Sequence, residues 1–222
     1  MNSRTQSLGL VAALMIGASG STALGGIVPP PWDPTLPMQT LQAWMFGPGN
    51  DPFAPTVANN PNGAPQFFPP TSGTYLPDNP LTPNNPGTGV WCLTGNTTLE
   101  FLIPNYNQQF RKEIFISIKY SVPSAGVGVP TAGVTGLSGT PGSPSGFTYT
   151  PEPVSPGVSM IHYHQSLPTC ESFMVSISFP IGIPGSVGYV EQVVVQTVCV
   201  PAPGGAAVAG LGILAASRRR RH

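Results

Sequence analysis

The stretch from Glu113 to Val122, which reads EIFISIKYSV, decides the fold class. Ile114, Ile116 and Ile118 point to one side of an extended chain, and the residues between them point to the other side. Apolar residues that recur with a period of two are typical of a β-strand with one buried face. We therefore predict a strand that packs one face against a hydrophobic core.

Similar short segments flank this stretch, and they are separated by Gly, Pro, Asn and Ser, which favour turns. No helical pattern is found between the two ends of the chain. One apolar face on each strand requires a second sheet to cover it, so we predict an all-β fold, an antiparallel β-sandwich or jelly roll. The expected strands are residues 90–94, 98–103, 113–122, 159–166, 173–181 and 188–200, with a further short one at 146–150 in a long loop over 123–157.

Residues 26–89 differ from the rest of the chain because they contain sixteen prolines, which cannot donate to a sheet ladder. The same region carries more aromatic residues than a linker normally has. We interpret 26–89 as an ordered Pro/Gly-rich arm laid over a sheet, with one short strand at residues 41–46, and 90–200 as the sandwich core. A disordered linker is the alternative. The aromatic residues are Trp32, Trp44, Phe46, Phe53, Phe67, Phe68 and Tyr75.

Residues 1–25 have the three parts of a secretory signal peptide. Arg4 makes the start positive, residues 8–16 (LGLVAALMI) form an apolar run, and small residues follow up to Ala23. The apolar run is shorter than the roughly 20 residues that a membrane span needs. We predict a signal helix that is cleaved after Ala23 or Gly25; a helix of the domain core is the alternative.

The last residues, 201–222, also form three parts. A Pro-Ala-Pro motif precedes an uncharged apolar run over 204–217, and an arginine cluster closes the chain. The pattern predicts a short transmembrane helix whose arginines stay in the cytoplasm, which places the preceding domain outside. A basic arm for nucleic acid is the alternative. The motif and cluster residues are Pro201, Ala202, Pro203, Arg218, Arg219, Arg220 and Arg221.

This tail resembles the PEP-CTERM sorting signal, in which a Pro-Glu-Pro-like motif, a short apolar helix and terminal arginines follow one another. Here Ala202 stands in the place of the glutamate. The resemblance implies that the chain passes through the export machinery and is processed by an exosortase-like enzyme. It also implies transient anchoring at the membrane through the tail, followed by release or attachment at the cell surface.

The body of the chain is also similar to β-sandwich domains of unassigned function that carry such tails. The similar segments are residues 41–47 (LQAWMFG), 59–63 (NNPNG), 101–105 (FLIPN), 111–120 (RKEIFISIKY) and 193–201 (VVVQTVCVP). This resemblance implies a fold and no chemistry.

Charge is distributed unevenly, although the basic and acidic residues balance at eight each. Between the two terminal segments lie three basic residues, Arg111, Lys112 and Lys119, against all eight acids. A weakly acidic domain with three scattered cations lacks the positive surface that nucleic acid requires. We therefore expect no nucleic-acid partner.

The three cysteines are Cys92, Cys170 and Cys199, and none has the spacing of a metal-binding pair. An exported protein can keep a disulfide, so one bonded pair and one free thiol is one interpretation. Three buried thiols is the other interpretation. The sequence does not choose among the three possible pairings.

His162 and His164 are the histidine pair that a strand would place on one face, where two imidazoles can share a metal ion. Glu171 follows seven residues later, which is too far for a cupin-like metal motif, and no third histidine follows within the domain. We interpret the pair as ordinary strand histidines and predict no metal and no cofactor. The sequence has no nucleophile elbow or phosphate-binding loop, so we also predict no enzymatic activity.

Two weaker patterns bear on ligand binding. Aromatic residues on a sheet face can stack against sugars, and Trp32, Trp44, Trp91 and Tyr149 are the candidates, with Trp91 better explained as core. Loop aspartates can hold Ca²⁺, but Asp33, Asp51 and Asp78 lack the spacing of a calcium loop and are better explained as turn residues. Acid pairs such as Glu100 with Glu113, or Glu152 with Glu171, would form a hydrolase site only if folding brought them together.

These patterns lead to one expected function and one alternative. We expect an exported, non-catalytic cell-surface or extracellular-matrix protein, membrane-anchored or released after processing. The alternative is a secreted carbohydrate-binding module with extracellular polysaccharide as its partner. An exported hydrolase is a third hypothesis.

Overall fold

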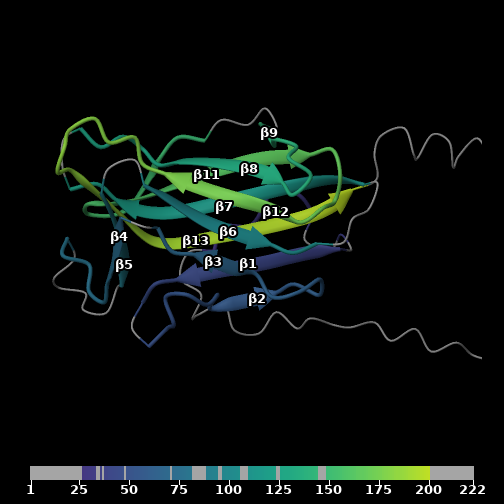
Figure 1. The fold of residues 1–222 in the computed structure, drawn as a ribbon, viewed down its shortest axis with the longest axis horizontal. Coiled ribbons are helices and arrows are strands. Elements are labelled where there is room, and N and C mark those ends of the chain that lie inside the picture. Colours follow the sequence, from purple (N-terminus) through teal and green to yellow (C-terminus); the bar gives the residue numbers. More distant parts are fainter. Residues whose placement is uncertain are drawn as a thin grey trace, which may run out of the picture.

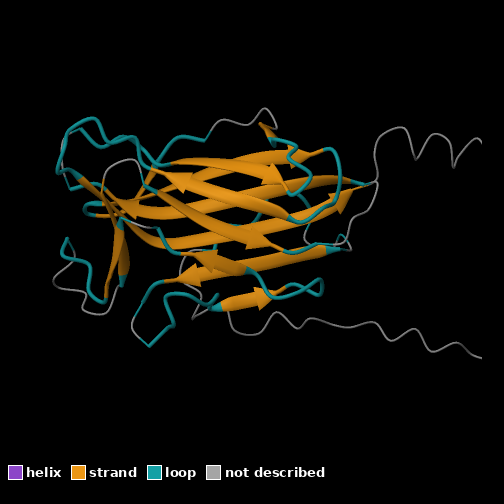
Figure 2. Ribbon diagram, viewed as in Figure 1, coloured by secondary structure: helices purple, strands orange, loops and turns teal. Residues whose placement is uncertain are grey.

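The computed structural model describes residues 27–33, 36, 38–47, 49–70, 72–81, 89–94, 97–105, 110–123, 126–144 and 149–200 (Figure 1). These residues form β-strands joined by loops, and no helix is found among them (Figure 2). Every strand pair is antiparallel. The prediction of an all-β antiparallel fold is confirmed.

The larger of the two sheets has nine strands and contains the order β10-β11-β7-β13-β1-β2, with β4, β5 and β9 attached to this path. Its strands are β1 (Gln39–Met45), β2 (Val57–Asn59), β4 (Gly73–Leu76), β5 (Val90–Thr94), β7 (Arg111–Ser121), β9 (Ser143–Pro144), β10 (Glu152–Ser155), β11 (Val158–Leu167) and β13 (Val187–Val200). The smaller sheet has the order β3-β6-β12-β8, formed by β3 (Gln66–Phe68), β6 (Thr98–Ile103), β12 (Phe173–Ser178) and β8 (Thr131–Gly136).

Strand β13, with fourteen residues, organises the larger sheet. One edge pairs with β7 over almost its whole length. The other edge pairs with β5 near its start and with β1 further along. The register of the β7 pairing shifts between Val190 and Gln192, which is the mark of a β-bulge at Glu191.

The two sheets pack against one another through a single hydrophobic core. Alternation places Ile114, Ile116 and Ile118 of β7 in this core, as their spacing predicts. From the other sheet, Phe101 brings its ring to 4.6 Å from that of Trp44 on β1. Each such side chain contributes roughly 2 kcal/mol when it leaves water. The arrangement is therefore sandwich-like, with the core between the two layers.

Residues 26–89 were expected to be an arm with one short strand, and the structure differs. The expected strand at 41–46 corresponds to β1, which lies inside the larger sheet between β13 and β2. The region also supplies β2, β3 and β4. Prolines flank these strands rather than interrupt them. Each strand is short, and no residue within it lacks the amide N–H that the sheet ladder needs. The described part of this region thus belongs to the two sheets.

The expected long loop over 123–157 also differs, because β8, β9 and β10 lie within it. Strand β8 has one large apolar residue, Val134, so it gives no alternating signal in the sequence. The short strand expected at 146–150 is not found at residues 149 and 150, and its other residues lie outside the described ones. The remaining expected strands correspond to β5, β6, β7, β11, β12 and β13, with ends shifted by up to three residues.

Both predicted targeting segments, the signal helix at 1–25 and the tail at 201–222, lie outside the described residues. Among the described residues, no helix has the length and apolar character of a membrane span.

Candidate functional site

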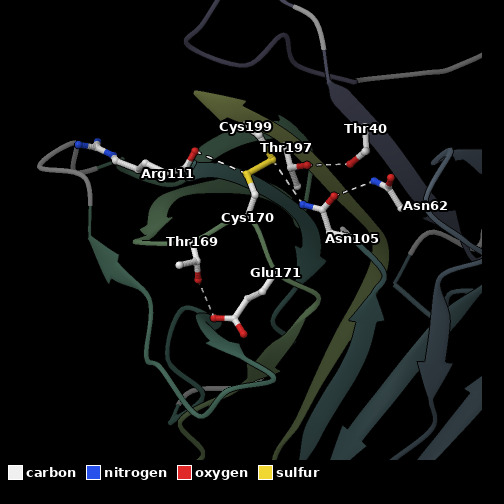
Figure 3. The surroundings of a disulfide bond; sticks show 9 residues. All are labelled: Thr40, Asn62, Asn105, Arg111, Thr169, Cys170, Glu171, Thr197 and Cys199. Carbon is white, nitrogen blue, oxygen red and sulfur yellow. Dashed lines mark hydrogen bonds between the residues drawn. A yellow bond between two sulfur atoms is a disulfide. The ribbon is translucent and has the colours of Figure 1, made fainter. Parts of the chain in front are cut away.

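A disulfide joins Cys170 and Cys199, one of the three pairings left open by the sequence (Figure 3). It connects the segment between β11 and β12 to the end of β13. The two Cα atoms are 5.9 Å apart, within the usual range for such a bond. Asn105 donates a hydrogen bond from Nδ2 to Sγ of Cys199 at 3.4 Å. The disulfide therefore fixes one end of the two-sheet arrangement.

Cys92 on β5 is a free thiol and is half-buried. Burial raises the pKa of this thiol, while a hydrogen bond from Tyr189 lowers it. A thiol with a raised pKa is mostly protonated at neutral pH and is a weak nucleophile. The residue therefore behaves as part of the packing of β5 against β13.

His162 and His164 lie on the face of β11 that points away from the core between the sheets. His162 stacks on Phe115 with the ring centres 5.3 Å apart and the planes nearly parallel. Its Nδ1 lies 2.9 Å from the hydroxyl of Ser117. Both partners belong to β7, the strand next to β11, so the register between the two strands brings these side chains together.

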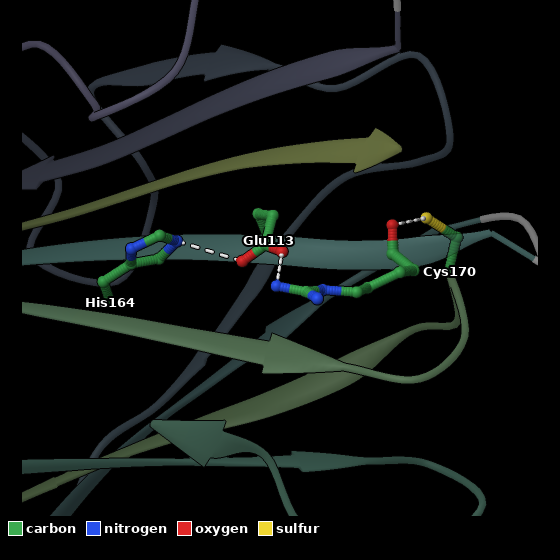
Figure 4. A network of polar contacts seen from close by, with 4 residues as sticks. Glu113, His164 and Cys170 are labelled. Atoms are coloured by element: carbon green, nitrogen blue, oxygen red, sulfur yellow. Dashed lines mark hydrogen bonds and ion pairs between the residues drawn. The ribbon is translucent and has the colours of Figure 1, made fainter. Parts of the chain in front are cut away.

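His164 is part of a chain of polar contacts on the same face (Figure 4). Its Nε2 lies 3.0 Å from Oε2 of Glu113, and the other carboxylate oxygen of Glu113 pairs with Arg111. Arg111 and Glu113 are two residues apart on β7, so they share this outer face. The carboxylate that could have served as a metal ligand or base is therefore held between Arg111 and His164.

Aromatic side chains cover this histidine face from two directions. Trp32 lies with its ring 5.8 Å from that of His164 and 6.5 Å from that of Phe115. Tyr149 approaches Phe115 and His162 at 5.7 and 5.6 Å. Phe115 is consequently only 2 % exposed, although it faces away from the central core. We call these residues, Trp32, Phe115, Tyr149, His162 and His164, the histidine–aromatic face.

The geometry of this face is that of packed side chains. Within the described residues, no group of three or more His, Cys, Asp or Glu side chains is placed to hold a metal ion. Glu171, the acid that follows the pair in sequence, instead accepts hydrogen bonds from the Ser138 amide and hydroxyl and from Thr169. Those bonds lower the pKa of its carboxyl group, although burial acts in the opposite direction.

The histidine–aromatic face makes stability depend on pH. Burial lowers the pKa of His162, and Glu152 opposes this only in part. The unfolded chain binds a proton at His162 more readily than the folded chain does. The stability that neutral His162 contributes is therefore fully present above about pH 6.5 and is lost as the pH falls below that value. We expect acidification from pH 7 to pH 5 to lower the thermal unfolding midpoint less in His162→Gln than in the natural chain. Equal pH slopes for both proteins would contradict this account.

The aromatic candidates for sugar stacking separate into two groups. Trp44 and Trp91 are 0 % and 3 % exposed and belong to the core, as the sequence suggested for Trp91 but not for Trp44. Trp32 and Tyr149 keep part of their surface exposed but pack on the histidine–aromatic face. The four candidates therefore do not form one exposed row.

The acidic candidates have separate structural partners. Glu100 is exposed on β6 of the smaller sheet, whereas Glu113 is buried on β7 of the larger one. Glu152 is exposed on β10, and the Glu171 carboxylate is occupied by its hydrogen bonds. Asp51 accepts a hydrogen bond from the Phe53 amide, which is the geometry of a turn.

The structure contains a hollow of about 340 Å³ that the sequence did not predict. It lies near β10, at the start of β11 and at the start of the connection between β7 and β8. Its lining carries no charged side chain and combines hydroxyl groups with aliphatic ones. The lining residues are Tyr120, Val122, Val127, Val129, Pro153, Ser155, Gly157, Val158 and Ser159. No local signal marks these residues in the sequence, because they come from three separate segments.

Comparison with known proteins adds little to this description. No family model matches the chain, and no curated protein matches it. A chain from the structure of infectious bursal disease virus, Gt strain, is similar with a TM-score of 0.35 and 11% sequence identity. The similarity covers 77% of this chain and 53% of that one, so this chain spans about half the length of its neighbour. A likeness this distant carries no argument about function.

Proposed function

We propose that this chain is an exported, non-catalytic cell-surface or extracellular-matrix protein with a β-sandwich or jelly-roll domain. The observation that carries the proposal is the Cys170–Cys199 disulfide. Structural disulfides persist in oxidising compartments and are rare in the cytosol. This agrees with the signal-like segment at 1–25 and the PEP-CTERM-like tail at 201–222, which both direct the domain outward.

A non-catalytic role is supported by how the buried acids are used. Glu113 is held by Arg111 and His164, and Glu191 by Lys119, Asn79 and Ser121. A general acid or base needs a carboxylate that can reach a substrate. These carboxylates instead have full sets of partners inside the protein, which is the pattern of groups that stabilise a fold.

The partners in this proposal follow from the two ends of the chain. They are the export machinery, an exosortase-like processing enzyme, and the membrane through the tail. Nucleic acid is not among them, because Arg111 and Lys119 are engaged in ion pairs and Lys112 is buried.

The proposal is tested by deleting residues 204–222 from the natural chain. We expect the truncated protein to move from the membrane fraction to the medium, because the apolar run and the arginines are then gone. The circular dichroism of the domain should stay unchanged, since the described core ends at β13. Replacing the four arginines alone by serine gives a control that keeps the apolar run. Finding the truncated protein still in the membrane would overturn the role of the tail.

A second candidate function is the binding of neutral extracellular carbohydrate, favoured by the uncharged hollow. Hydroxyl groups of Ser155 and Ser159 and the aliphatic wall at Val129 lie together there. Sugars present hydroxyl groups and apolar C–H faces, and such a lining matches both.

This candidate is tested on a glycan array with the full chain. Binding of neutral glycans that is lost in Val129→Glu would support it, because the substitution places a charge in a hollow that has none. Val154→Glu is the control, because Val154 lies outside the lining and is 50 % exposed, against 40 % for Val129. Silence across all glycans would remove the candidate and leave the surface role in place.

A further inference from the structure

Lys112 on β7 has its amine inside the fold. The residue has no exposed surface, and Nζ lies 4.7 Å from the centre of the Phe173 ring on the opposite sheet. Nζ has no hydrogen-bond partner in the part of the chain that the structure describes. A buried ammonium group without a hydrogen-bond partner is costly, although the face of the Phe173 ring attracts it. Burial lowers the pKa of Lys112 to about 7.

The charged neighbours along β7 do not neutralise this amine. Arg111 and Glu113 flank it in sequence, and alternation points both to the opposite face of the sheet. There Glu113 is occupied by Arg111 and His164.

The other elements around Lys112 supply no counter-charge among the described residues either. Its neighbours in register are Leu167 on β11 and Cys199 on β13. Glu171 lies between Cys170 and Phe173 in sequence, but its carboxylate accepts hydrogen bonds from Ser138 and Thr169. Lys112 therefore lies between Leu167 and Cys199 in register, with its amine over the Phe173 ring.

The disulfide lies at the same end of the fold. Cys199 sits beside Lys112 in register, and Sγ of Cys170 is 3.7 Å from the carbonyl oxygen of Arg111. The bond closes a sequence separation of 29 residues that includes β12 and most of β13. A disulfide of this kind stabilises a protein mainly by restricting its unfolded chain. One end of the fold thus combines a destabilising buried amine with a stabilising cross-link.

We propose that the Cys170–Cys199 disulfide is a redox switch of stability. It offsets the free-energy cost of burying the Lys112 amine, so that the oxidised chain stays folded and the reduced chain unfolds readily. Its biological consequence rests on the proposed function. In the reducing cytosol the thiols stay reduced, so the fold is less stable there and the chain unfolds more readily for export. Outside the cytosol, thiol–disulfide exchange with a donor disulfide forms the Cys170–Cys199 bond: the donor takes up the two electrons and two protons of the thiols and leaves as a dithiol. The bond then stabilises the fold.

The test compares thermal unfolding of the full chain with and without dithiothreitol, for the natural protein and for Lys112→Met. We expect reduction to lower the midpoint of the natural protein by about 10 °C. Lys112→Met removes the buried amine and keeps an apolar stem, so both of its midpoints should rise. The reduced variant should then stay folded at a temperature that unfolds the reduced natural protein.

Lys119→Met is the matched control, because Lys119 is partly exposed and paired with Glu191, and this change should not raise the midpoint. A pH series gives a second measurement. The unfolded lysine binds its proton more readily than Lys112 does, so stability should rise from pH 7 to pH 9 in the natural protein and less in Lys112→Met. The proposal is overturned if reduction leaves the midpoint unchanged, or if Lys112→Met is no more stable than the natural chain. Neither outcome depends on where the protein resides in the cell.

Discussion

Replacing Phe67 by alanine is expected to lower the free energy of unfolding by about 3–5 kcal/mol, the usual cost of removing a buried aromatic ring. Phe67 lies on β3, a strand of three residues, and is 7 % exposed. Its ring stacks on Phe101 with centres 4.9 Å apart and contacts Trp91 at 5.3 Å. Urea denaturation followed by tryptophan fluorescence measures the loss.

Phe68 supplies the matched control, because it is the same residue type at the next position and is 40 % exposed. Phe68→Ala should cost less than about 1 kcal/mol, since exposed substitutions are usually mild. The pair also tests whether residues 26–89 belong to the folded core. Similar losses for both variants would mean that β3 does not alternate between core and solvent.

Removing the carboxylate of Glu191 is expected to cost about 2–4 kcal/mol, because a buried donor left without an acceptor costs about 1–3 kcal/mol. Its Oε1 accepts hydrogen bonds from Asn79 at 2.7 Å and Ser121 at 2.8 Å, and its Oε2 lies 2.9 Å from Nζ of Lys119. Asn79 and Ser121 are themselves buried, so Glu191→Ala leaves their donors without an acceptor. Thermal or urea denaturation of the variant measures the effect.

Two further variants separate charge from position. Glu191→Gln keeps one acceptor oxygen and loses the charge, so its loss should be smaller than that of Glu191→Ala. Glu152→Ala removes an exposed acid from β10 and should be close to neutral. If Glu191→Ala were as mild as Glu152→Ala, the contacts that Glu191 makes with its partners would not contribute to stability.

The sequence was informative where strands are long and alternate. The spacing of Ile114, Ile116 and Ile118 predicted which face of β7 enters the core, and the structure confirms it. The same two-residue alternation places Lys112 on the core side of β7, so its burial could have been predicted from the sequence. The expected strand began at Glu113, so Lys112 was not assigned to either face, whereas β7 begins at Arg111.

Other features had no local signal. β3 is three residues between prolines, and only its contacts with distant residues such as Phe101 make Phe67 part of the core. Alternation points Phe115 away from the core, but Trp32 and Tyr149, which come from distant segments, cover it. The choice of Cys170 and Cys199 over Cys92 likewise depends on which strand ends meet in space.

Fractionation of the producing cells decides whether the domain resides outside the cytosol. Immunoblots of cytosol, membrane and medium, with mass spectrometry of the recovered chain, give its location, its ends and the state of its cysteines. We expect a protein in the membrane or medium that lacks residues 1–25 and carries the Cys170–Cys199 bond. An intact 222-residue chain, soluble in the cytosol with both cysteines reduced, would contradict it.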